Sequence, residues 1–144
     1  MKKRRMNEEG FVEVYNPGVN TFIEVPVYNA VSALNKAGVF TRSSGFHTRY
    51  HDANDNISPR WAIIVGGKIP VWLKTILLKH GFEYEEKKPK EVTYQRWLYT
   101  CIYLSKKVTG ERNFRKAKKL FNEFAQEINR KAKSFHKSIV GIKK

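Results

Sequence analysis

The sequence predicts an α+β fold, and three observations lead to this prediction. Runs rich in β-forming residues alternate with segments whose apolar residues recur at helical spacing. Glycine, proline and asparagine lie between these segments, where turns are expected. The hydrophobic content of 41% in 144 residues is enough to fill one core in a chain of single-domain size.

The strands and helices of the first part of the chain follow from these patterns. The predicted strands are the runs TFIEV, GFHTRYH, PRWAIIV and FEYEE, and a further strand is open at VEVY. One helix, VYNAVSALNKAG, ends at Gly38. A second, IPVWLKTILLKHG, has Pro70 near its first turn and Gly81 at its end. The order βαββαβ predicts a ferredoxin-like sheet domain over residues 10–86, with two helices on one face of four antiparallel strands.

The second part of the chain is predicted to be an appended helical hairpin. A charged, proline-containing linker, EKKPKE, precedes two stretches with helical spacing, residues 92–107 and 111–137. We expect this hairpin, residues 92–137, to pack on the sheet domain or to extend from it. Residues 1–9 form a basic N-terminal arm, and residues 138–144 a basic tail.

The charge of the chain predicts a strongly anionic partner. Lys and Arg number 28 against 13 Asp and Glu, which gives a net charge of +15, and most of this excess lies in residues 96–144. Such a balance favours nucleic acid, oligonucleotides or an acidic protein surface, including a ribonucleoprotein complex. Whether the nucleic acid is DNA or RNA stays open.

Location and cofactors are predicted from what the sequence lacks. MKKRRM precedes NEEGFVEVYN instead of an apolar signal segment, and no apolar run is long enough to span a membrane. The one cysteine, Cys101, lies in an apolar pattern and is expected to be buried in an intracellular, cytoplasmic protein. We expect no membrane partner, no metal and no cofactor, whereas self-association stays open.

The last predicted helix is the main candidate for binding. Its apolar stripe is expected to face the protein, and the opposite face carries the cations Arg112, Arg115, Lys119, Arg130, Lys133 and Lys137. A row of this kind suits contact with successive phosphates. The alternatives are a lysine-rich solvated surface and an amphipathic helix at a membrane surface.

The preceding predicted helix offers a related surface. Its outer side would carry Arg96, Tyr99, Tyr103, Lys106 and Lys107. Tyrosines among cations suit single strands, because each base stacked on an aromatic ring contributes about 1–3 kcal/mol. The alternative is that these tyrosines pack against a neighbouring element or a second subunit.

The β-hairpin carries a smaller candidate site. A period of two places His47, Arg49 and His51 on one face of the strand. Two imidazoles beside a guanidinium suit phosphate contact more than acid-base cleavage of a phosphate. The alternative is a set of polar residues on a solvated sheet face, and their spacing fits no metal motif.

A third candidate follows the strand PRWAIIV, where Gly66, Gly67 and Lys68 precede a helix. Glycines let backbone N–H groups approach an anion, and the helix start adds its positive dipole end. The alternative is an ordinary strand-to-helix turn whose following helix buries its apolar residues in the core.

The run IIVGGKIPVWLKTILLKH resembles the small CRISPR-associated ring nucleases that degrade cyclic oligoadenylate messengers in type III immunity. The matching positions are Gly67, Lys68, Pro70, Val71, Trp72 and Leu73. Ile69 replaces a glycine of that family, His80 lies one place from the family's helical histidine, and no Asp-Pro-Arg run follows. The resemblance therefore implies nucleotide binding rather than cleavage.

Three hypotheses on function remain open. The first is a non-catalytic nucleic-acid-binding protein, such as a ribonucleoprotein subunit or a phage or mobile-element protein, that contacts phosphates with its basic C-terminal helix. The second is a sponge or ring nuclease for cyclic oligonucleotide messengers in antiviral defence or anti-defence. The third is a protein-docking inhibitor or virion component. Enzymatic activity is the less favoured expectation.

Overall fold

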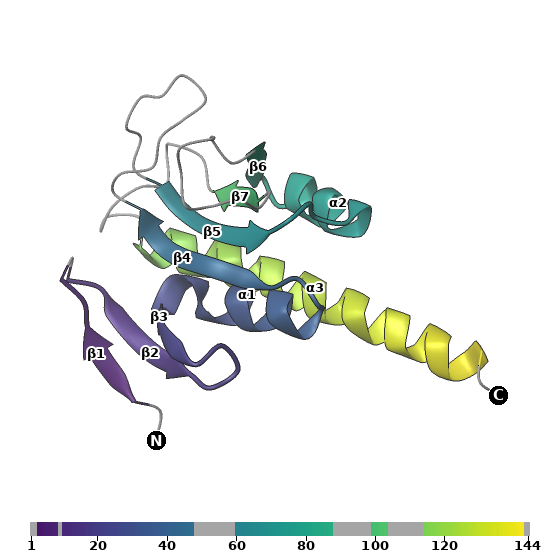
Figure 1. Ribbon diagram of the computed structural model, residues 1–144, viewed down its shortest axis with the longest axis horizontal. Helices are drawn as coiled ribbons and strands as arrows, with labels where there is room; N and C mark the ends of the chain where they lie inside the picture. Colours follow the sequence, from purple (N-terminus) through teal and green to yellow (C-terminus); the bar gives the residue numbers. More distant parts are fainter. Residues whose placement is uncertain (1–2, 9, 48–59, 88–98, 104–113, 143–144) are drawn as a thin grey trace.

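The computed structural model describes residues 3–8, 10–47, 60–87, 99–103 and 114–142, with side chains except at positions 47, 87, 99 and 135–142. These residues form two antiparallel sheets and three helices (Figure 1). The predicted α+β class is therefore confirmed at this level, including a helix at the C-terminal end of the chain.

The larger sheet has four antiparallel strands in the order β4-β5-β7-β6. Their bounds are Thr41–His47 for β4, Arg60–Gly66 for β5, Glu83–Lys87 for β6 and Tyr99–Tyr103 for β7. β4 and β5 pair antiparallel, as the predicted hairpin expected, but β4 begins at Thr41 instead of Gly45, and residues 48–51 of the predicted strand lie outside the described residues. Helix α2, Val71–Lys79, connects β5 to β6 across the place that β7 fills between them.

The smaller sheet has the order β1-β2-β3, with β1 at Arg4–Met6, β2 at Val12–Asn16 and β3 at Thr21–Glu24. β2 corresponds to the additional strand that the run VEVY left open. β3 was expected to be the first strand of a ferredoxin-like sheet, but it pairs with β2 instead. The ferredoxin-like order is thus not confirmed. β3 pairs with β2 because a short turn after Asn16 favours pairing between strands that are neighbours in the sequence.

The predicted helix over residues 92–107 is wrong at Tyr99–Tyr103, which is the strand β7. β7 pairs with β5 on one side and β6 on the other, so its backbone groups are bonded along both edges. Thr100, Cys101 and Ile102 are all buried, which removes the alternation that marks a half-exposed strand. Cys101 is a buried free cysteine, as expected, although it lies in a strand.

The three helices begin and end at recognisable residues. Helix α1, Val25–Lys36, has a proline in its first turn and is followed by Gly38 with a positive φ of 85°. Helix α2 starts after Pro70, and Phe82 N–H donates to the Leu77 carbonyl at 2.9 Å as the chain leaves it. Helix α3, Phe114–Ile142, continues past the predicted end at residue 137.

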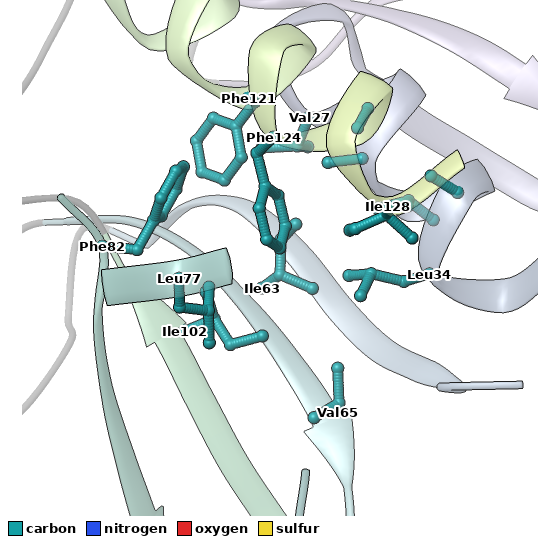
Figure 2. Packing of buried hydrophobic residues seen from close by; sticks show 14 of the residues in the cluster. Val27, Leu34, Ile63, Val65, Leu77, Phe82, Ile102, Phe121, Phe124 and Ile128 are labelled. Carbon is teal, nitrogen blue, oxygen red and sulfur yellow. The ribbon is translucent and has the colours of Figure 1, made fainter. Parts of the chain in front are cut away.

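One hydrophobic core joins all three helices to the four-stranded sheet. Figure 2 shows Phe121 and Phe124 of α3 directed towards Phe82, with Ile63 and Ile102 of the sheet below them. The Phe82 ring lies 5.1 Å from that of Phe121 and 4.9 Å from that of Phe124, centroid to centroid. Helix α3 is therefore part of the core over this stretch.

Beyond this stretch α3 leaves the body of the protein. Its C-terminal part extends past both sheets (Figure 1). Helix α3 packs extensively against α1 and less extensively against α2. Among the described residues, every helix is too short or too polar to cross a lipid bilayer.

Candidate nucleic-acid interface

The outward face of α3 carries exposed cations over most of its described length. Arg115, Lys119, Arg130 and Lys133 are exposed, as predicted, whereas Phe121 on the opposite face is fully buried. At a rise of about 1.5 Å per residue, Arg115 and Lys133 lie about 27 Å apart along the helix axis. The predicted cations of this helix that the structure describes thus share one surface.

Three more cations widen this surface. Lys116, Lys118 and Lys131 are also exposed on α3. The carboxylates of the helix are Glu123 and Glu127, and both are partly buried. The outward surface of α3 is therefore strongly cationic, with its acidic residues set back towards the body.

Glu127 pairs with one cation from α2 and one from α3. Its carboxylate accepts hydrogen bonds from Lys79 Nζ of α2 and from Arg130 Nη2, each at 2.6 Å. His80 Nε2 lies 3.9 Å from the same carboxylate. The hydrogen bonds from Lys79 and then Arg130 lower the pKa of Glu127 below its ordinary value. The charge of Arg130 is thus partly neutralised within the molecule.

The other predicted cations of α3 are in different surroundings. Among the described side chains, no carboxylate pairs with Arg115, Lys119 or Lys133. Within the described part of the chain their charge is therefore not neutralised by an acidic neighbour. Arg112 lies outside the described residues, and at Lys137 only the helical backbone is described.

A groove lies between α2 and α3 beside this surface. Its volume is about 440 Å³, and its walls are residues at helical spacing on each helix. Trp72 and Ile76 of α2 supply apolar surface, and the charged lining residues are Lys79, Glu127, Arg130 and Lys131. The ion pair between Lys79 and Glu127 joins the two walls.

The tyrosine surface predicted on the residues before α3 is not formed as expected. Tyr103 lies on β7 and is partly buried, with its ring 5.5 Å from the guanidinium carbon of Arg60. Burial, and then the nearby Glu85 and Glu83, raise the pKa of Tyr103. For Tyr99 only the strand backbone is described, and Arg96, Lys106 and Lys107 lie outside the described residues. Tyr99 and Tyr103 therefore lie on a strand and not on the expected helix.

The predicted histidine site can be followed only in part. His47 ends β4 in register with Arg60 of β5, its side chain is not described, and Arg49 and His51 lie outside the described residues. Arg60 itself is 4% exposed. Within the described structure its Nε and Nη1 atoms have no hydrogen-bond partner. The burial of Arg60 is a feature that its place at the start of an apolar run did not predict.

The glycine segment forms a turn between β5 and α2. Gly66 ends β5, Gly67 has a positive φ of 77°, and Lys68 is exposed. The Thr100 hydroxyl donates to the Gly67 carbonyl at 2.8 Å, so the turn is held against β7. The following helix buries Leu73, Ile76 and Leu77 as the turn alternative expected. The phosphate contact predicted for Gly66, Gly67 and Lys68 stays a prediction.

The residues that join α2 to α3 were missed by sequence reasoning. Trp72 packs against the core and also lines the groove, and Lys79 was not singled out. Their helical spacing and charge are visible in the sequence, whereas the partner helix is not. Among the described residues, no group of three or more potential metal-ligating side chains lies together.

Comparison with known proteins finds no matching family model, no similar curated protein and no similar solved structure. The resemblance of the segment around Gly67 to ring nucleases thus stays a prediction. The candidate function rests on the residues of the chain itself.

Proposed function

We propose that the protein is a non-catalytic nucleic-acid-binding protein that contacts phosphates with the outward face of α3. One observation carries this proposal. Arg115, Lys119 and Lys133 are exposed along one helix face with no carboxylate paired to them among the described side chains. Exposed, unneutralised cations release counterions from a phosphate chain when they bind it.

The position of the core supports this use of the helix. Phe121, Phe124 and Ile128 bury the opposite face completely, so the cationic face cannot turn inwards without losing the core. The row is therefore held on a rigid element, which keeps its charges in fixed register for a regular polyanion.

The test is a charge reversal on this face. Lys119→Glu together with Lys133→Glu is expected to weaken binding to DNA or RNA by about tenfold or more at low salt, because two phosphate contacts become repulsive. Binding is measured by filter retention or mobility shift between about 50 and 200 mM salt.

A matched control separates this face from net charge. Arg4→Glu together with Lys36→Glu makes the same change in net charge at exposed positions on β1 and α1. We expect this control to retain most of the affinity. Equal losses in the two variants, or absence of binding by the unaltered protein at low salt, would overturn the proposal.

A further inference from the structure

The cations on the outward face of α3 fall into two groups, with an interval between them. Arg115 and Lys119 are exposed on the N-terminal side of this interval, and Lys133 is exposed on the C-terminal side. The sequence has no lysine or arginine between Lys119 and Arg130. In the middle of the interval the outward face carries Gln126, which is exposed and neutral. The positive charge of this face is therefore concentrated towards its two ends.

Lys119, Gln126 and Lys133 lie in one row along the helix. They follow one another at intervals of seven residues. Seven residues are almost two helical turns, so the direction of the side chain changes by about 20° at each step. At a rise of about 1.5 Å per residue, the two lysines lie about 21 Å apart along the axis, with Gln126 halfway. Two cations are thus held at a fixed separation on one side of α3.

We propose that α3 spans the major groove of a DNA duplex, with Lys119 on one sugar-phosphate backbone and Lys133 on the other. The inference rests on the proposed function and names the form of nucleic acid that this surface recognises. The major groove of B-DNA is about 12 Å wide and the minor groove about 6 Å. A helix that crosses the major groove obliquely covers its width and reaches both backbones within about 21 Å. The narrower minor groove matches this separation less well.

The interval without cations favours a duplex over a single strand. A single strand lying along α3 would present phosphates to the middle of the helix as well as to its ends. The middle has no cation, and it carries the carboxylates Glu123 and Glu127, which oppose a phosphate. In a duplex that α3 spans, the middle of the helix lies over the groove, away from the phosphates. The charge distribution therefore matches two separated backbones rather than one continuous chain of phosphates.

The position of α1 limits how closely the middle of α3 approaches the bases. Asn29 Nδ2 of α1 donates a hydrogen bond to Asn122 Oδ1 of α3 at 3.0 Å, so α1 lies beside the middle of α3. A helix with a neighbour on its flank does not enter the major groove to its full depth of about 8.5 Å. Contacts at the rim of the groove are made to phosphates, which carry no sequence information. Binding is therefore expected to be independent of base sequence.

The decisive experiment moves one cation along α3 without changing the composition of the protein. Gln126→Lys together with Lys133→Gln places the second lysine about 10 Å from Lys119 instead of about 21 Å, at the same net charge. We expect the unaltered protein to bind duplex DNA about tenfold more tightly than a single strand of the same length. The exchange should lower affinity for the duplex about fivefold and reduce the slope of log K against log salt by about 0.9, because one backbone loses its contact. Affinity for the single strand should change by less than about twofold, because a continuous chain of phosphates meets a lysine at either position.

A matched exchange away from α3 controls for the movement of charge itself. Arg4→Thr together with Thr21→Arg moves one cation between exposed positions on β1 and β3. This control should change affinity for neither form of DNA. Both positions of the α3 exchange are exposed, and lysine and glutamine have similar helix propensities. The unfolding midpoint in urea should therefore be the same for the α3 exchange as for the unaltered protein.

A second measurement tests the expected independence of base sequence. Two duplexes of equal length and unrelated sequence should be bound with affinities within about twofold of each other, because contacts to phosphates do not distinguish bases. A preference of about tenfold or more for one of them would require contacts to base edges and would contradict a helix that stays at the rim of the groove.

The outcomes separate this inference from the proposed function. Equal losses on duplex and single strand in the α3 exchange, no loss on the duplex, or tighter binding of the single strand by the unaltered protein would overturn the spanning arrangement. The cationic face would remain the binding surface in each of these cases. Failure of the unaltered protein to bind either form would overturn the proposed function itself.

Discussion

The two ends of the cationic surface on α3 carry similar side chains in different electrostatic surroundings. At the N-terminal end, Arg115 and Lys119 have no paired carboxylate among the described side chains. Near the groove, Lys79 and Arg130 both bond Glu127 at 2.6 Å. The same residue types therefore lack a carboxylate partner among the described side chains at one end, whereas at the other they bond Glu127, and Lys79 thereby links α2 to α3.

This difference shows why a count of charges is a poor guide to a binding surface. A net charge of +15 treats every cation alike. Glu127 partly neutralises Lys79 and Arg130. Arg115, Lys119 and Lys133 have no carboxylate partner among the described side chains, so they contribute more to the positive potential of the surface. Which cations can reach a partner depends on the packing of α2 against α3, and that packing lies beyond the local sequence.

The largest effect is expected on stability, from truncating Phe124, which fixes α3 in the core between the two ends of its cationic surface. Phe124 is fully buried and packs on Phe82 and the sheet. Phe124→Ala should lower the free energy of unfolding by about 3–5 kcal/mol, because it removes apolar burial and leaves a cavity. Urea unfolding measures the change.

Gln126→Ala, on the exposed face of the same helix, is the matched control for Phe124→Ala. It should change the free energy of unfolding by no more than about 0.5 kcal/mol. Similar values for the two variants would mean that α3 is not anchored in the core, and the contrast between its ends would lose its basis.

The sequence predicted α3, α1, α2 and the hairpin of β4 and β5 because each has a clear period or turn signal. It failed at Tyr99–Tyr103, since a short apolar run buried on both faces of a sheet has no alternation to separate it from a helix. The β-forming character of Tyr, Thr and Ile in that run was the better signal. The pairing of β3 with β2 was missed because the period of a strand does not specify its partner.

The candidate site was predicted to a similar extent. The outward cations of α3 follow from helical spacing alone, so Arg115, Lys119 and Lys133 were found. Lys79 and Glu127 are 48 positions apart in the sequence, and only the fold brings them together. A two-helix groove is a tertiary feature, and each of its walls reads as an ordinary amphipathic helix when taken by itself.

The next effect concerns the salt dependence of binding at the two ends. Arg115→Ala with Lys119→Ala should reduce the slope of log K against log salt by about 1.8, because each lost phosphate contact contributes about 0.9 on duplex DNA. Lys79→Ala with Arg130→Ala removes the same charge but should reduce the slope by less. Equal changes in the two double variants would remove the distinction between the ends.

The smallest effect is expected from releasing the paired cations. Glu127→Gln keeps the size of the side chain but removes the charge that Lys79 and Arg130 bond. Affinity for nucleic acid should rise slightly more than in Glu123→Gln, which makes the same change in net charge on the same helix. The stability of the protein should fall slightly, because the two helices lose an ion pair.

The pH dependence of this small loss identifies its origin. Hydrogen bonds from Lys79 and then Arg130 lower the pKa of Glu127 below 4.5 in the folded protein. A lowered carboxyl pKa stabilises the folded state above the unfolded value, and this contribution is lost as the pH falls through the folded pKa. The difference in unfolding midpoint between the unaltered protein and Glu127→Gln should therefore be present near neutral pH and vanish in acid. A difference that persists in acid would mean that the Glu127 side chain stabilises the protein through packing rather than through its charge. The contrast between the two ends of α3 would then be one of packing and not of electrostatics.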